Sequence, residues 1–205
     1  MVGSNRRLMR VFWVVGIVVA GVLVGLGVRL YREGADSLNF IASGSALVGG
    51  PFTLVDQDGK PRTDAEFRGS LMLVYFGYTY CPDVCPTELQ TMSDALDALG
   101  DKAAKVQPIF ITVDPERDTP PVVKDYVSHF HPRFIALTGT PSQVDAAEKA
   151  YRVYAAKAPS KSGGNDYLMD HTGLVYLMGR NGKYLTSFTP QTTPQQMAQA
   201  IAQRL

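Results

Sequence analysis

The sequence predicts a three-layer α/β domain preceded by an N-terminal transmembrane helix. Three observations predict this arrangement: an uncharged apolar run near the N-terminus, two strand patterns that are apolar throughout, and apolar residues at helical spacing between them. Strands and helices that alternate along a chain are typical of a sheet covered by helices. The 205 residues, 45% of them hydrophobic and 19% charged, suffice for one sizeable domain and this appendage.

The first element is the run 11–28, which contains no charged residue. As a helix it would be about 27 Å long at ~1.5 Å per residue, close to the hydrocarbon thickness of a bilayer. Arg6, Arg7 and Arg10 precede it, so the positive-inside bias predicts that residues 1–10 stay in the cytoplasm or the mitochondrial matrix. A cleaved signal peptide is the alternative, but its apolar core is usually ~7–15 residues long. We therefore expect an uncleaved, single-pass anchor.

Charge is unevenly distributed along the chain. Residues 1–34 carry five arginines and one glutamate, a formal charge of +4, so the net charge of +1 leaves −3 for the remainder. The remainder has no stripe of Lys and Arg, which argues against nucleic acid as a partner. Residues 29–50 are polar and rich in Gly, Ser and Ala, as expected for a tether to a domain that spans residues 51–205.

The domain begins with a predicted strand at residues 52–55 and a turn at Asp56-Gln57-Asp58-Gly59. Residues 71–76 are apolar throughout, the pattern of a central strand buried on both faces. A helix is predicted next, because apolar residues then recur at helical spacing. These residues are Leu89, Met92, Leu96 and Leu99.

The second half of the domain continues the alternation. Residues 106–113 form a second buried strand in this prediction, and residues 120–130 a helix. Further on, the patterns predict an extended segment at 134–137, a helix at 142–156, and a hairpin of strands 174–178 and 184–188 around Asn181-Gly182. A final helix over 194–205 has Thr193 as its N-cap and Pro194 at its first position.

The only two cysteines of the chain lie directly after the first central strand, in Cys81-Pro82-Asp83-Val84-Cys85-Pro86. Thioredoxin-like folds carry their cysteine pair at this junction of strand and helix, so we predict a thioredoxin-like fold. A helix that begins near Cys85 directs unpaired N–H groups at the thiols and favours thiolate. Thiolate is both a nucleophile and a ligand for soft metals, so redox chemistry and metal binding both fit. A structural disulfide is the third alternative, although so short a loop stabilises little.

One histidine, His171, is predicted at the same end of the sheet as the cysteines. It lies in Asp170-His171-Thr172-Gly173, which we predict as a loop in the place where thioredoxin-like folds carry a cis-proline. Asp170 is expected to orient the imidazole. Cys81, Cys85 and His171 offer two sulfurs and one nitrogen, too few for structural zinc but suited to copper. A solvated loop histidine is the alternative.

Other residues have two interpretations each. Met169 is either an additional weak copper ligand or a core methionine. His129 and His131 lie at the end of a predicted helix, far from the cysteines, and are expected to be solvated or capping residues. The segment Asp114-Pro115-Glu116-Arg117-Asp118-Thr119-Pro120 follows the second buried strand and is either a helix-capping turn or a loop that docks a partner.

Three motifs, in this order, resemble the Sco/SenC family. They are Phe76-Gly77-Tyr78-Thr79-Tyr80-Cys81-Pro82-Asp83-Val84-Cys85-Pro86, Asp114-Pro115-Glu116-Arg117-Asp118-Thr119-Pro120 and Asp170-His171. The resemblance covers roughly residues 45–205 and the N-terminal anchor. It implies a thioredoxin-like fold tethered to the bacterial cytoplasmic membrane or the mitochondrial inner membrane. It also implies delivery of copper to the dinuclear copper centre of cytochrome c oxidase subunit II.

The family's copper ligands correspond to Cys81, Cys85 and His171 of this sequence. The chain departs from many members at Tyr80, where they have a histidine; this removes an auxiliary ligand but none of the three principal ones. The resemblance leaves open whether the copper is Cu(I) or Cu(II). Further partners that it implies are a copper donor chaperone and a thioredoxin-like reductant.

Two functions follow from these expectations. The first is a copper metallochaperone that holds the ion on two cysteines and one histidine. The alternative is a thiol–disulfide reductase, in which Cys81 and Cys85 keep the cysteines of the recipient site reduced. We expect the domain to face the bacterial periplasm, because the leader is short and resembles no transit peptide; the mitochondrial intermembrane space is the alternative.

Overall fold

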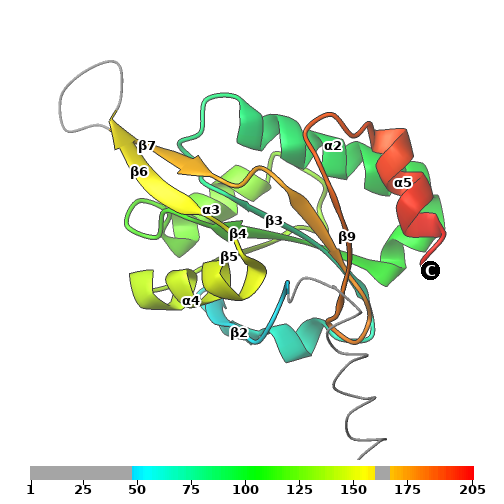
Figure 1. The fold of residues 1–205 in the computed structure, drawn as a ribbon, viewed down its shortest axis with the longest axis horizontal. Coiled ribbons are helices and arrows are strands. Elements are labelled where there is room, and N and C mark those ends of the chain that lie inside the picture. The colour runs from blue at the N-terminus through cyan, green and yellow to red at the C-terminus, as the bar shows by residue number, and fades with distance from the viewer. Residues whose placement is uncertain (1–47, 160–166) are drawn as a thin grey trace, which may run out of the picture. The chain divides into compact units, whose positions relative to one another are not determined.

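The computed structural model describes residues 48–159 and 167–205, which are built around a seven-stranded sheet (Figure 1). The strand order is β2-β1-β5-β4-β3-β8-β9, and β6 and β7 form a separate two-stranded sheet. The predicted anchor at residues 11–28 and most of the predicted tether lie outside the described residues. Within the described part of the chain, no helix has the length and apolar character needed to span a bilayer.

The centre of the sheet is the pair of parallel strands β3 (Leu71–Gly77) and β4 (Val106–Thr112). Every residue of β3 is buried, because β4 lies on one side of it and β8 (Val175–Met178) pairs antiparallel on the other. β5 (Ile135–Thr138) continues the sheet parallel to β4, and β9 (Tyr184–Phe188) closes the opposite edge next to β8. The predicted central strands and the predicted hairpin are thus confirmed.

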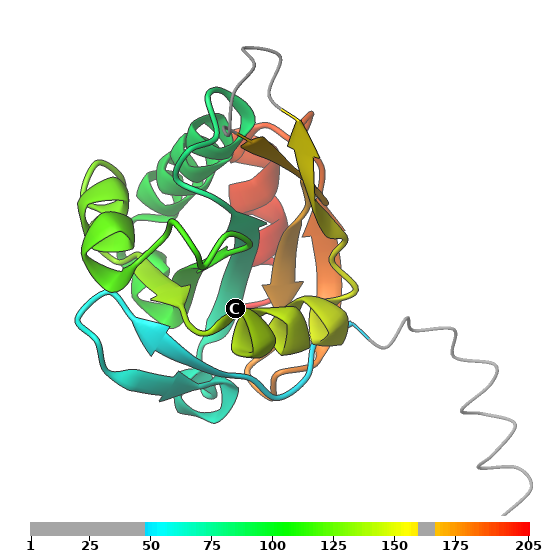
Figure 2. The same ribbon diagram turned by 90° about the vertical axis from the view of Figure 1, so that its left-hand side faces the viewer.

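Helices cover both faces of the sheet (Figure 2). On one face, α2 (Val84–Leu99) packs against α5 (Pro194–Ala202), and the Tyr126 ring of α3 (Pro120–Val127) packs on Phe110 of β4. On the other face lies α4 (Pro141–Tyr151). Two short 3-10 helices, Asp64–Phe67 and Gly100–Lys105, complete the connections. This arrangement is the predicted three-layer plan.

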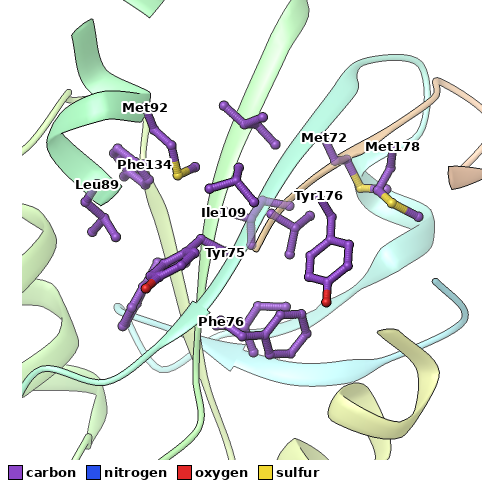
Figure 3. Packing of buried hydrophobic residues seen from close by; sticks show 14 of the residues in the cluster. Met72, Tyr75, Phe76, Leu89, Met92, Ile109, Phe134, Tyr176 and Met178 are labelled. Carbon is purple, nitrogen blue, oxygen red and sulfur yellow. The ribbon is translucent and has the colours of Figure 1, made fainter. Parts of the chain in front are cut away.

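Successive residues of β3 contribute to different halves of the core (Figure 3). Tyr75 points toward Leu89 and Met92 of α2, whereas Phe76 points toward Tyr176. The Phe76 ring also packs on Tyr151 of α4, with ring centroids 5.3 Å apart. The alternation of side chains along a strand therefore assigns Tyr75 to the face that carries α2 and Phe76 to the face that carries α4.

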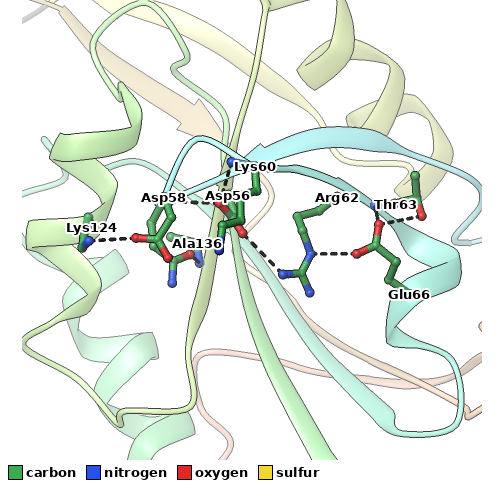
Figure 4. A network of polar contacts seen from close by, with 9 residues as sticks. Asp56, Asp58, Lys60, Arg62, Thr63, Glu66, Lys124 and Ala136 are labelled. Atoms are coloured by element: carbon green, nitrogen blue, oxygen red, sulfur yellow. Dashed lines mark hydrogen bonds and ion pairs between the residues drawn. The ribbon is translucent and has the colours of Figure 1, made fainter.

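The edge of the sheet formed by β1 (Thr53–Asp56) and β2 (Pro61–Thr63) is held by a polar network (Figure 4). The Asp56 carboxylate accepts hydrogen bonds from the backbone N–H groups of Asp58, at 3.0 Å, and Lys60, at 2.9 Å. Asp58 in turn pairs with Lys124 of α3 at 2.7 Å. The predicted turn is confirmed, and its acidic residues serve to fix this hairpin.

Two expectations about the second half of the chain are wrong. The helix predicted over residues 142–156 ends at Tyr151, because Arg152 adopts a left-handed backbone conformation with φ of 59°. The following residues form β6 (Ala155–Pro159), which pairs antiparallel with β7 (Tyr167–His171). His171 is therefore the last residue of a strand rather than part of a loop.

Candidate metal centre

The two cysteines lie where the central strand gives way to helix α2. Cys81 is half-buried in the connecting loop, and Cys85 is fully buried in the first turn of α2. Both are free thiols, and the backbone N–H of Cys85 donates to the Cys81 sulfur at 3.4 Å. A helix N-terminus thus directs a hydrogen-bond donor at the more accessible sulfur, as the sequence predicts.

The structure brings His171 to this cysteine loop. Its Nε2 lies 3.5 Å from the Cys85 sulfur, although 86 residues separate the two in the chain. Its Nδ1 lies 3.2 Å from the carbonyl oxygen of Thr172. A proton on Nδ1 that is donated to this carbonyl leaves Nε2 as the acceptor nitrogen facing the thiols.

The expected role of Asp170 is wrong, because the imidazole contacts the backbone of Thr172 instead. Asp170 is exposed, and it precedes His171 in β7, so the two side chains point to opposite faces of the strand. The two residues are adjacent in the sequence, but successive side chains of a strand point to opposite faces, so the carboxylate does not orient the imidazole.

Hydrogen bonding between the two thiols makes them unequal. The hydrogen bond from the Cys85 thiol, together with hydrogen bonds from backbone N–H groups, holds the pKa of Cys81 far below its usual range. The same contact with Cys81 and burial raise the pKa of Cys85 far above its usual range. The half-exposed sulfur of Cys81 is therefore the thiolate, and the buried sulfur of Cys85 keeps its proton.

A buried carboxylate fixes the cysteine loop to the neighbouring loop. Asp118 is fully buried and accepts hydrogen bonds from the Thr79 hydroxyl at 2.6 Å, the Thr79 backbone N–H at 3.0 Å and the Thr112 hydroxyl at 2.6 Å. The pKa of Asp118 is raised, because the effect of burial exceeds the lowering effect of these hydrogen bonds. Because Thr79 lies two residues before Cys81, Asp118 fixes the position of the first thiol.

Arg117, from the same loop, contacts both segments that carry the site. Its guanidinium carbon lies 3.7 Å from the centre of the Tyr167 ring, in β7, and 4.7 Å from that of Tyr80, in the cysteine loop. Arg117 also pairs with the buried carboxylate of Asp114, and the Tyr167 hydroxyl donates to Asp114 at 2.8 Å. The segment 114–120 thus joins β7 to the cysteine loop. Of the two roles predicted for this segment, the helix-capping turn is confirmed, since Thr119 is the N-cap position of α3, and the docking of a partner stays a prediction.

Comparison with known proteins identifies the group to which this arrangement belongs. Residues 42–205 match the family described as SCO1/SenC. The chain belongs to the SCO1/SenC family. Membership confirms what the three sequence motifs indicate.

A relative matches this SCO1/SenC protein over most of both chains, and solved structures share its fold. A SCO2-like protein of Rickettsia felis is 37% identical over 194 residues, 90% of this chain and 94% of the relative. The structure of Bradyrhizobium japonicum ScoI with copper bound is 48% identical, with a TM-score of 0.72 over 77% of this chain and 99% of that one. The structure of BsSco, described as a member of the Sco family of cytochrome c oxidase assembly proteins that has a disulfide switch, is 26% identical, with a TM-score of 0.58 over 76% of this chain and 91% of that one. These similarities confirm the mixed α/β, thioredoxin-like fold.

The remaining histidines of this SCO1/SenC chain, His129 and His131, contact backbone groups near the end of α3. Nδ1 of His129 lies 2.9 Å from the Asp125 carbonyl, at the end of α3. Nδ1 of His131 accepts the backbone N–H of Arg133 at 3.2 Å, so this ring caps the turn that follows α3. Both contacts agree with the expectation that these histidines are solvated or capping residues.

Met169 packs against the hydrophobic core and lines a cavity of about 150 Å³. The same cavity is lined by Glu148 of α4, whose pKa is raised to about 7 by burial first and by the charge of Asp145 second. These surroundings favour the interpretation of Met169 as a core methionine.

Among residues 48–159 and 167–205, no group of three or more His, Cys, Asp or Glu side chains already has the spacing of a closed metal site. The Cys85 sulfur lies 3.5 Å from the His171 imidazole, so binding one ion through all three groups requires these side chains to move. The sequence analysis did not identify Tyr78 or Asp118 as site residues. Their sign in the sequence is that both lie within the motifs that resemble the Sco/SenC family.

Proposed function

We propose that this protein is a membrane-anchored copper metallochaperone that binds copper through Cys81, Cys85 and His171. It delivers the ion to the dinuclear copper site of cytochrome c oxidase subunit II. The observation that carries the proposal is the 3.5 Å distance between the Cys85 sulfur and His171 Nε2, two soft-metal donors from segments 86 residues apart. Copper is bound to the related ScoI, and BsSco is described as belonging to a family of cytochrome c oxidase assembly proteins.

The chemistry of the donors supports copper as the cargo. Two thiols and an imidazole match the preferences of copper, whereas structural zinc sites usually have four protein ligands. Of the two sulfurs, Cys81 is half-exposed and already favours the thiolate form. Binding of the ion displaces the remaining thiol proton, from Cys85, to solvent.

The unequal exposure of the two sulfurs supports transfer by ligand exchange. A thiolate of the recipient bonds to the ion while the bond to Cys81 breaks, so the oxidation state of the copper does not change. The buried Cys85 and His171 are released afterwards, and Cys85 recovers a proton from solvent. The predicted anchor at residues 11–28 holds this exchange at a membrane surface, with the domain on the periplasmic side.

The test is a titration of the full-length protein, purified in detergent, with Cu(I) under anaerobic conditions against a competing chelator. We expect His171→Ala to weaken binding on the order of 100-fold, equivalent to about 2.7 kcal/mol. His129→Ala is the matched control, since His129 is exposed and contacts only the end of α3. A His171→Ala protein that binds one Cu(I) with wild-type affinity would show that the assigned ligands are wrong.

A thiol–disulfide reductase is the second candidate, and the inequality of the two thiols favours it. The Cys81 thiolate attacks a disulfide sulfur of the recipient, forming a mixed disulfide and releasing the recipient's other sulfur as thiolate. Cys85 then gives its proton to that thiolate and attacks Cys81, which frees the second recipient sulfur. Two electrons pass from the dithiol to the recipient, and a Cys81–Cys85 disulfide remains.

Alkylation of the reduced protein tests this assignment of roles. Because the pKa of Cys81 is lowered, its thiolate persists as the pH falls from 8 to 6, so we expect iodoacetamide to label Cys81 at similar rates at both values. In guanidinium-unfolded protein, where thiols titrate near 8.5, labelling should slow by roughly 50- to 100-fold over the same interval. Mass spectrometry of the peptides identifies the labelled residue. A native rate that falls as steeply as the unfolded one, or faster labelling of Cys85, contradicts the assignment.

A further inference from the structure

Tyr78 contacts both the cysteine loop and His171. Its carbonyl accepts a hydrogen bond from the Cys81 backbone N–H at 3.3 Å. Its ring meets the His171 imidazole edge-on, with centroids 5.8 Å apart and an interplanar angle of 90°. Edge-to-face packing at this separation is the favoured geometry for a pair of aromatic rings.

The Tyr78 side chain is itself held firmly in place. Only 3% of the residue is exposed. Its ring packs against the imidazole of His171, the last residue of β7, while its own backbone belongs to the cysteine loop. Tyr78 therefore contacts both segments that carry the proposed ligands.

A second aromatic ring, that of Tyr75, also packs against the imidazole, with ring centroids 6.1 Å apart and an interplanar angle of 73°. Tyr75 lies within the central strand, where its place follows from the sheet. Tyr78 lies after the strand has ended, in the loop that carries Cys81. Of these two aromatic contacts of His171, Tyr78 is thus the one that transmits the position of the cysteine loop directly to the histidine.

We propose that Tyr78 is a positioning residue, which fixes the His171 imidazole against the cysteine loop so that the three side chains can bind one copper ion. This inference rests on the proposed copper site. It assigns the effect to the ring of Tyr78, because the ring edge is what contacts the imidazole.

The test compares Cu(I) affinities of Tyr78→Leu and Tyr78→Phe in the full-length protein, each with His171 present and with His171→Ala. Loss of a residue that orients a metal ligand typically costs 10- to 100-fold in metal affinity. We expect Tyr78→Leu to weaken Cu(I) binding at least about 10-fold when His171 is present and by less than about 2-fold when it is absent. Tyr78→Phe retains the ring and should bind within about 3-fold of wild type.

Tyr176→Leu is the matched control. Tyr176 is also a tyrosine with 3% exposure, but its ring packs on Phe76 and Tyr151, on the opposite face of the sheet. We expect it to lower stability without changing Cu(I) affinity. If Tyr78→Leu fails to fold, Tyr78→Met, which is longer and flexible but has no ring edge, replaces it in the same comparison.

Several results would overturn the inference. One is wild-type affinity for Tyr78→Leu, or equal losses with and without His171, since the effect would then not pass through the imidazole. Another is a Tyr78→Phe protein that binds as weakly as Tyr78→Leu. Wild-type affinity for His171→Ala alone would instead reject the copper ligands themselves, and this inference with them.

Discussion

The two segments that supply the proposed ligands differ in how they are supported. The cysteine loop continues a strand buried at every residue, between two other strands and under α2. His171 ends β7, a strand in which no residue is fully buried and which pairs only with β6. Cys85 therefore belongs to the buried centre of the fold and Cys81 to the loop attached to it, whereas the imidazole is carried by a peripheral hairpin.

Because of this difference, the two segments can have different roles in the proposed site. Sulfurs fixed by the core provide a constant part of the site, since core positions move little. A histidine on a less buried element can move relative to them, which suits a site that must bind an ion and later release it. Tyr78, Asp118 and Arg117 are then the contacts that decide how closely the two segments are coupled.

The largest expected effect is on the cysteine side, from Asp118→Ala. The substitution leaves two donors of half-buried Thr79 and one of buried Thr112 without an acceptor, so we expect a loss of about 3 kcal/mol in the free energy of unfolding. Denaturation followed by circular dichroism measures it. Asp101→Ala, at an exposed aspartate, is the control and should cost less than about 0.5 kcal/mol. Equal losses in the two variants would show that Asp118 does not anchor the loop.

Alanine substitutions at two glycines, one in each segment, compare the two segments directly. A Cβ on Gly77 would lie 2.8 Å from the Tyr75 ring and 3.0 Å from the Cys85 sulfur, whereas one on Gly173, after His171, would have only an ordinary contact at 3.8 Å. We expect Gly77→Ala to destabilise the fold by about 2 kcal/mol through overpacking. Gly173→Ala should change the free energy of unfolding by less than about 0.5 kcal/mol. Similar effects at both positions would remove the contrast between a rigid and a tolerant segment.

Arg117 tests the connection between the segments. Arg117→Lys keeps the charge but loses the planar group that stacks on Tyr80 and Tyr167, so we expect a loss of about 1 kcal/mol. Lys157→Gln is the matched control, because exposed Lys157 also lies over the Tyr167 ring, at 4.5 Å, but its ammonium group pairs with Glu116 rather than stacking on the cysteine loop. Thermal unfolding of both variants separates stacking from charge, and equal shifts would contradict a bridging role for the guanidinium.

The smallest expected effect concerns Glu148, in the cavity beside Met169. Its pKa is raised to about 7, so the folded state binds a proton that the unfolded state releases above about 4.5. This contribution to stability is present below pH 4.5 and is lost as the pH rises through 7. We expect Glu148→Gln to match wild type at pH 4.5 and to be more stable at pH 8, by less than about 1 kcal/mol because the carboxyl is only half-buried.

Asp145→Asn sharpens that experiment. Removal of the Asp145 charge should lower the pKa of Glu148 and shift the loss of stability to lower pH, because that charge is the second cause of the raised value. The free energy of unfolding measured at several pH values distinguishes the variants. A Glu148→Gln difference that is the same at pH 4.5 and pH 8 contradicts titration of this carboxyl.

The sequence predicted those elements whose pattern is strong and local. The apolar run of β3 allows only a buried strand, and Thr193 followed by Pro194 marks the start of α5, where Thr193 accepts the N–H of Gln196. The end of α4 was predicted wrongly, because the left-handed conformation of Arg152 is uncommon for a residue other than glycine. β7 was missed because its residues are half-buried and polar in part, which leaves no clear period of two.

By itself, therefore, the sequence determined that two thiols lie at a strand–helix junction and that His171 is the histidine at the same end of the sheet. Only the tertiary structure decided that Nε2 of His171 faces Cys85, that Tyr78 packs on the imidazole, and that Asp118 accepts from Thr79. The physical reason is sequence separation. Local spacing encodes hydrogen bonds and periodicities within one element, whereas contacts across 86 or 39 residues arise only when the strands pair and bring their ends together.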